Sequence, residues 1–135
     1  DVYKRQGNIF LTKDIERILG ISSIQEFSLN NPEKIEEQIK LMWSNPNLFK
    51  ENSSFAFLFI GEIKNEVVDQ FRSSLESFIP SKKLIFTKSL LESKKMDIQF
   101  LIIKKGAITR NELIDLKQKI ALQNNSTLEL LILDD

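Results

Sequence analysis

Ser54-Phe-Ala-Phe-Leu-Phe-Ile-Gly61 is the most apolar stretch of the chain, and the fold is inferred from it outward. Phe55 to Ile60 are six consecutive apolar residues, followed directly by Gly61 and the polar Glu62. An apolar run of this length that ends at a glycine is typical of a β-strand buried on both faces. We therefore expect this stretch to be the central strand of the main domain.

The composition of the chain narrows the classes of function. Its 135 residues suffice for one domain with, at most, a small extension. Nineteen basic and nineteen acidic residues cancel, so no overall charge favours nucleic acid or an anionic membrane. The apolar runs are shorter than the ~20 residues that a transmembrane helix needs, so we expect no membrane span. The absence of cysteine fits a reducing compartment, and we expect a cytoplasmic protein.

The first residues, Asp1-Val-Tyr-Lys-Arg-Gln6, match nothing that follows in pattern. We expect residues 1–7 to be a non-native or disordered leader and exclude them from fold reasoning. On this interpretation the chain is the C-terminal part of a larger protein.

Residues 8–52 are expected to form a helical extension or linker. A short helix should end at Gly20, since glycine is a common residue just after a helix. Asn31, Pro32 and Glu33 then supply a strong helix start, with an N-cap, a proline in the first turn and an acid. An apolar stripe follows at helical spacing, made of Ile35, Ile39, Met42 and Trp43.

From residue 54 the pattern becomes regular and has the order β-α-β-β-α-β. The predicted elements are strand 55–60, helix 65–79 ending at Pro80, strands 83–90 and 96–103, a helix from the capping box Thr109-Arg-Asn-Glu112 to about Asn124-Asn125, and strand 128–133. This order is that of the split βαβ, or ferredoxin-like, arrangement. We therefore predict an α+β domain over residues 53–135, with an antiparallel sheet of strand order 4-1-3-2 and two helices on one face.

That sheet order predicts which strands should be most apolar and which should carry the features of an edge strand. Strands one and three should be central and most apolar, and strands two and four should be edges. The second strand carries Lys82, Lys83 and Lys88, which are the charges that an edge strand needs against aggregation. The fourth strand fits less well, because only Glu129 interrupts its apolar run.

The face of the sheet away from the two predicted helices should also be covered. The first strand places Phe55, Phe57 and Phe59 on one face but Ala56, Leu58 and Ile60 on the other. Leaving several such side chains in water would forfeit roughly 1.5–3 kcal/mol each. The candidates for the cover are the stripe of residues 35–43 and a second copy of the domain.

Residues suited to catalysis are scarce. The chain has no histidine and no cysteine, which removes the commonest general base, the thiolate nucleophile and the commonest transition-metal ligands. Its four glycines are too dispersed for a phosphate-binding loop or a dinucleotide fingerprint. We therefore expect a protein that is not an enzyme and that has no metal or cofactor.

The loop after the first strand is one candidate ligand site. Gly61, Glu62, Lys64 and Asn65 precede a predicted helix, whose free N–H groups and dipole favour an anion. Regulatory amino-acid-binding domains of the ACT type use this loop, and Gly61 resembles part of their turn. The resemblance implies a small anion or amino acid as ligand. The alternative is that Gly61 only ends a strand and Asn65 only caps a helix.

A second candidate is a nucleic-acid or acidic-partner surface. The segment Leu58-Phe-Ile-Gly-Glu-Ile63 resembles the first motif strand of RNA-recognition domains, which stack bases on exposed aromatic side chains. The resemblance implies Phe59 as one platform, and Phe100 is the aromatic residue of the third strand. Seven lysines make the predicted hairpin of strands two and three basic: Lys82, Lys83, Lys88, Lys94, Lys95, Lys104 and Lys105.

Taken together, the sequence favours a non-catalytic regulatory, interaction or assembly module. It would bind a protein partner or a second copy of itself through a sheet face or an edge strand. The first alternative is an RNA-binding domain of RNA-recognition-like topology. The second is a domain that senses a small anion or an amino acid and is attached to an enzyme or transporter.

Overall fold

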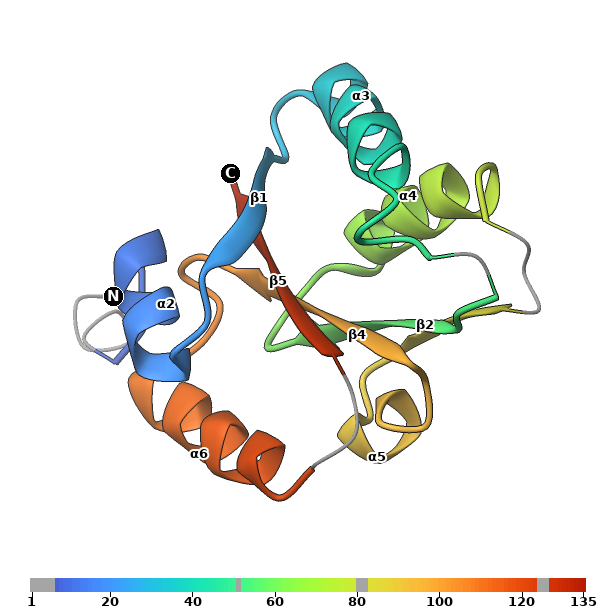
Figure 1. Ribbon diagram of the computed structural model, residues 1–135. Helices are drawn as coiled ribbons and strands as arrows, with labels where there is room; N and C mark the ends of the chain where they lie inside the picture. The colour runs from blue at the N-terminus through green and yellow to red at the C-terminus, as the bar shows by residue number, and fades with distance from the viewer. Residues whose placement is uncertain (1–6, 51, 80–82, 124–126) are drawn as a thin grey trace.

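The structure of the chain is a computed structural model that describes residues 7–50, 52–79, 83–123 and 127–135. In these residues helices and strands alternate along the chain (Figure 1). The elements are α2 (Thr12–Leu19), β1 (Ser23–Ser28), α3 (Pro32–Trp43), β2 (Phe55–Ile60), α4 (Asn65–Glu76), β3 (Leu84–Thr87), α5 (Leu90–Ser93), β4 (Ile98–Lys104), α6 (Arg110–Ala121) and β5 (Thr127–Asp134). The strands form one sheet in the order β1-β5-β4-β2-β3, and every neighbouring pair is parallel.

The prediction of an antiparallel, ferredoxin-like sheet is wrong. It required residues 83–90 and 96–103 to form a hairpin joined by a polar turn. Instead, Leu90 to Ser93 form the single helical turn α5, whose N-cap Ser89 accepts a hydrogen bond from the N–H of Glu92 at 3.4 Å. This turn carries the chain back along the sheet. As a result β4 is parallel to β2 and lies on the opposite side of it from β3.

The positions of the strands are partly as predicted. β2 and β4 are central, and β3 is an edge strand. β5, however, is not an edge: it lies between β4 and β1, which comes from the segment that we expected to be helical. This interior position explains why only Glu129 interrupts the apolar run of β5. The true second edge, β1, has one fully buried residue, Phe27, so its sequence carries little strand signal.

One face of the sheet is covered by α3 and α4 (Figure 1). Ile35, Ile39 and Met42 of the predicted apolar stripe are buried there, and Trp43 packs against the same cluster. The rings of Phe57 and Phe100 stack in its centre, with centroids 4.7 Å apart and planes at 6°. The stripe does cover the sheet, but on the same face as α4. α6 lies on the other face, so the prediction that the helices of residues 65–79 and 109–125 share one face is wrong.

The opposite face is covered by α2 and α6, with α5 beside them (Figure 1). Ile15 of α2 and Leu113 of α6 are fully buried against Leu58, Leu101 and other residues of the central strands. α6 begins at the predicted capping box: Thr109 accepts from the N–H of Glu112, and Glu112 accepts from the N–H of Thr109. Residues 1–6, Pro80, Lys82 and Asn124–Asn125, to which we gave structural roles above, lie outside the described residues.

Candidate functional site

The turn after β2 is packed against the connection between β4 and α6. Gly61 has a φ of 84°, and a Cβ at this position would lie 2.7 Å from the carbonyl oxygen of Ala107. The N–H of Glu62 donates to the same oxygen at 3.4 Å. In open parallel sheets, ligands usually bind between the carboxyl ends of two such strands, where the chain leaves in opposite directions. Here the protein itself fills much of that crevice.

The hollow that remains beside this turn does not suit an anion. It has a volume of about 280 Å³ and is lined by Asn8, Gly61, Glu62, Gly106, Ala107, Thr109 and Glu112. Two of these residues are carboxylates. Lys64 and Asn65 do not line the hollow: the exposed Lys64 is the N-cap of α4 without a side-chain cap, and Asn65 is the first residue of that helix. The structure thus brings Gly61 and Glu62 to the hollow but not the other two candidate ligand residues.

The two aromatic residues considered for base stacking are inside the protein. Phe59 is 3% exposed and Phe100 is 0% exposed, and both belong to the cluster under α3 and α4. Stacking on a base requires an exposed ring face. Neither ring is available, so the expected RNA-binding platform does not exist.

The predicted basic hairpin is also divided, because its two strands are parallel. Lys83 lies at the amino edge of the sheet, whereas Lys88 lies at the carboxyl edge. Lys94 and Lys95 follow α5 near the amino end of β4. At the carboxyl end of β4, Lys104 pairs with Asp135 at 3.2 Å, and Lys105 pairs with Glu26 and Asp134. The lysines therefore do not form one phosphate-binding surface.

The ion pairs of Lys105 stabilise the fold and do not activate this lysine. Hydrogen bonds from Lys105 and Thr12 lower the pKa of Glu26, although burial acts the other way. Burial alone would lower the pKa of Lys105, but its contacts with Glu26 and Asp134 outweigh that effect and raise the pKa. A catalytic lysine needs a lowered pKa. Lys105 is thus held in its charged form.

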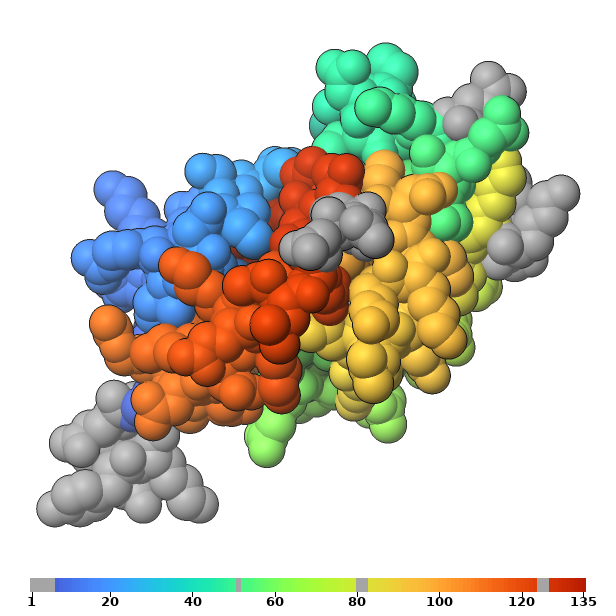
Figure 2. Space-filling view, turned by 60° about the horizontal axis from the view of Figure 1, so that its bottom comes forward, coloured from blue at the N-terminus to red at the C-terminus, as the bar shows by residue number. Residues whose placement is uncertain are grey.

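Two largely apolar hollows lie between α5 and α6. Figure 2 looks onto the face where α6, in orange, and α5, in yellow, lie side by side. One hollow of about 400 Å³ is lined by Leu58, Phe59, Ile60, Gly61, Lys88, Leu90, Glu112, Asp115, Leu116 and Lys119. A second hollow of about 500 Å³ is lined by Ser89, Leu90, Leu91, Lys94, Lys119, Leu122 and Gln123. Because Leu90 and Lys119 line both, the two hollows form one groove, which we call the α5–α6 groove.

The groove exists because α5 is short. α3, α4 and α6 have twelve residues each, whereas α5 has four. A longer crossover helix at this place would lie beside α6 and cover the carboxyl ends of β2 and β3. The single turn of α5 leaves that space open.

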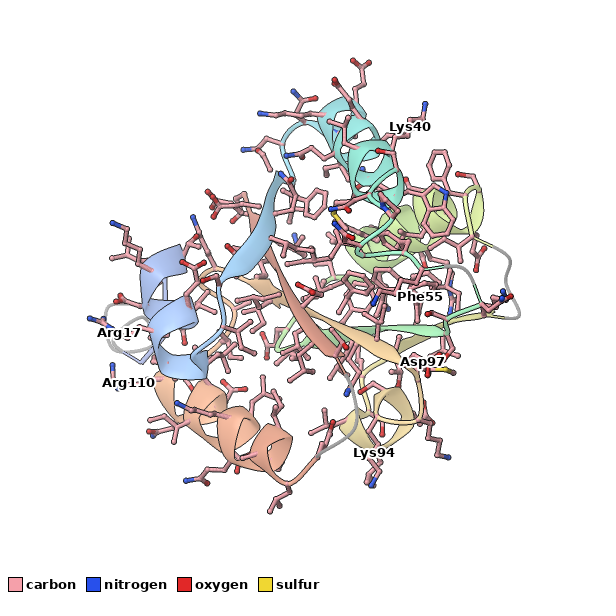
Figure 3. The ribbon with its side chains drawn as sticks, in the orientation of Figure 1. Arg17, Lys40, Phe55, Lys94, Asp97 and Arg110 are labelled. Atoms are coloured by element: carbon pink, nitrogen blue, oxygen red, sulfur yellow. The ribbon has the colours of Figure 1, made fainter. Side chains whose placement is uncertain are left out.

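Leucine side chains project from both walls of the groove into solvent. Leu91 of α5 is 68% exposed, and Leu122, at the end of α6, is 85% exposed. Single exposed leucines are common on protein surfaces, but Leu91 and Leu122 both line the second hollow and so belong to one apolar surface. Lys94, the C-cap residue of α5, extends outward from the protein (Figure 3).

A chain of polar side chains holds the two walls to the sheet. Gln99 of β4 is fully buried and accepts a hydrogen bond from Ser93 of α5 at 2.6 Å. Its amide donates to Gln123, just after α6, at 2.9 Å. Buried polar groups that are satisfied in this way fix the geometry around them. The width of the α5–α6 groove is therefore set by the fold.

The sequence interpretation missed this groove. Of its residues, Lys88 and Lys94 were singled out as parts of a hairpin, Gly61 as part of an anion-binding loop and Phe59 as a base-stacking platform, but not as parts of one groove. A usable signal was present at Leu122, because Leu113, Leu116 and Ile120 give α6 its buried face and Leu122 lies off it. No comparable signal marks α5, since a four-residue helix is too short to show a period.

Three further observations bear on the classes of function. Among the described residues, no group of three or more acidic side chains could hold a metal ion. No helix in the same residues is long and apolar enough to cross a membrane. Comparison of the chain with protein-family models, with curated proteins and with solved structures finds no match.

Proposed function

We propose that this chain is a non-catalytic interaction module that binds a segment of another protein in the α5–α6 groove. The observation that carries the proposal is the pair of exposed leucines, Leu91 and Leu122, on opposite walls of a groove whose floor is also apolar. Burying each of these side chains is worth roughly 1.5–3 kcal/mol. A partner that covers both therefore gains a substantial part of a micromolar binding energy, which is about 8 kcal/mol.

The groove is a better candidate than the sheet surfaces that the sequence suggested. Both faces of the sheet are covered by the protein's own helices. The edge strand β3 has only four residues and is flanked by Lys83 and Lys88. Short, lysine-flanked edges are typical of strands that avoid pairing with another chain.

A polypeptide fits the groove better than a small molecule does. Leu91 and Leu122 line the second hollow but are 68% and 85% exposed, so a ligand confined to the hollow would leave part of each side chain in water. A peptide lying along the groove would cover the rims and the floor at once. The role is non-catalytic because the walls carry leucines, lysines and engaged carboxylates, and the sequence has no histidine or cysteine.

A peptide-display selection on the immobilised protein tests the proposal. Binders would be measured against the wild type, Leu91→Glu and Leu122→Glu, with Leu41→Glu as the matched control. Leu41 is 66% exposed but lies on α3, which covers the other face of the sheet. We expect each groove variant to weaken binding about 10- to 100-fold and the control to leave it unchanged.

NMR chemical-shift mapping then locates the bound peptides, and shifts are expected at α5 and α6. Binders that bind all three variants equally, or that perturb other elements instead, would refute the proposal.

A further inference from the structure

The charge of the α5–α6 groove changes along its length. The hollow nearer the amino edge of the sheet is lined by Lys94 and Lys119 and by no acidic residue. The hollow nearer the carboxyl edge contains Lys88 and Lys119 together with Glu112 and Asp115. The apolar part of the groove, with its two exposed leucines, is therefore the basic part as well.

The two acidic residues are already engaged within the chain. Glu112 accepts the N–H of Thr109 in the capping box at 3.0 Å. Asp115 pairs with Lys119 at 2.9 Å, but both side chains are about 60% exposed, at 59% and 61%. Such a surface pair is worth roughly 0–1 kcal/mol and does not cancel the attraction of Lys119 for a further carboxylate.

The shape of the groove favours a helical occupant. It follows α6 from Glu112 to Gln123, a length of about 16 Å at 1.5 Å per helical residue. It occupies the place where the other crossovers of the sheet carry a helix of twelve residues. A helix of two to three turns on the partner would complete the layer beside α6 and present an apolar stripe to the groove.

We propose that the occupant of the groove is an amphipathic helix of a partner protein that carries carboxylates beside its apolar face. The apolar face packs on Leu90, Leu91 and Leu122, and the carboxylates lie near Lys94 and Lys119. This inference rests on the proposed function, because it names the partner class for the same groove. Charges placed in this way contribute chiefly to specificity and to the rate of association.

Two synthetic helical peptides test the inference. Both have about 14 residues and the same leucine stripe, but one carries glutamates beside the stripe and the other carries lysines. Their dissociation constants would be measured by fluorescence anisotropy at low and at physiological salt. The proteins are the wild type, the double variant Lys94→Glu/Lys119→Glu and the control Lys13→Glu/Lys34→Glu, whose lysines are exposed on α2 and α3.

We expect the acidic peptide to bind the wild type and the control about tenfold more tightly than the basic peptide, with a preference that shrinks at high salt. In Lys94→Glu/Lys119→Glu the preference should invert, which a general loss of structure cannot produce. If the double variant does not fold, Lys94→Glu alone replaces it in the same measurement, after circular dichroism has shown that this single variant is folded.

The outcomes separate the two proposals. Equal binding of both peptides, mapped to α5 and α6, would refute the charge preference and leave the groove as a binding site. Failure of both peptides, while display-selected peptides still bind the groove, would refute the helical, acidic occupant alone. If the display selection also yields no groove binder, the proposed function fails too.

Discussion

Alanine substitution at three glycines should destabilise the protein to different extents. Gly20, Gly61 and Gly106 have φ values of 72°, 84° and 78°. An L-residue in this left-handed region costs about 1–2 kcal/mol. Alanine also restricts the unfolded chain more than glycine does, which offsets about 0.4–1 kcal/mol of this destabilisation. The backbone contribution is therefore nearly the same at all three positions, close to 1 kcal/mol of destabilisation.

What differs is the atom that the new methyl group would meet. At Gly20 the nearest atom is the flexible Nζ of Lys117 at 3.7 Å, which is an ordinary contact. At Gly106 it is the ring of Phe10 at 2.7 Å, and this half-exposed side chain can rotate away. At Gly61 it is the backbone oxygen of Ala107 at 2.7 Å. A shift of that backbone adds about 1–3 kcal/mol.

We therefore expect losses of about 1 kcal/mol for Gly20→Ala, somewhat more for Gly106→Ala and about 2–4 kcal/mol for Gly61→Ala. Urea unfolding followed by tryptophan fluorescence measures them, because Trp43 is the only tryptophan and its ring lies 4.6 Å from that of Phe49. The slope of the transition should stay constant across the series. Equal losses for Gly20→Ala and Gly61→Ala would show that the turn after β2 is not packed as described.

Three other changes test the core, the capping of α6 and the ion pairs at the carboxyl edge. Phe100→Ala should cost about 3–5 kcal/mol in urea unfolding because the ring is fully buried, and a loss below about 1 kcal/mol would contradict its central place. Thr109→Ala should cost about 1 kcal/mol through the lost cap, and Thr109→Ser should restore most of it. Glu26→Gln should cost about 1 kcal/mol or less near neutral pH, since the pair with Lys105 is partly exposed. Because the pKa of Glu26 is lowered by folding, the stability that it adds is present above its unfolded pKa and lost as the pH falls through the folded pKa. Unfolding curves of the two proteins should therefore converge in acid, and a gap that persists there would contradict the assignment.

Local signals in the sequence predicted local structure well. The strand Phe55–Ile60 has the predicted bounds, and Gly20 follows α2 in the left-handed conformation. Asn31 caps α3, with Pro32 at its first position, as the start signal indicated. Each of these depends on the conformation of a few adjacent residues, which a short pattern can specify.

The direction of the strands could not be predicted in the same way. An apolar run predicts a buried strand but not whether its neighbour is parallel. That choice depended here on α5, which has four residues and no visible period, and on β1, which has one fully buried residue. The α5–α6 groove exists because α5 is short. Predicting a hairpin turn in place of α5 therefore gave the wrong topology and also missed the candidate site.

The pairing of β1 with β5 also has a consequence for how the chain folds. Ser28 is paired with Asp134, so strands near opposite ends of the described chain become neighbours in the sheet. During synthesis, Phe27 leaves the ribosome long before Leu131 and Leu133, beside which it is finally buried. Contacts between such distant residues require a large loop to close and slow the search for the native state. β1 therefore lacks this partner strand until β5 has been made, and a translation product interrupted before β5 would present β1 to other chains.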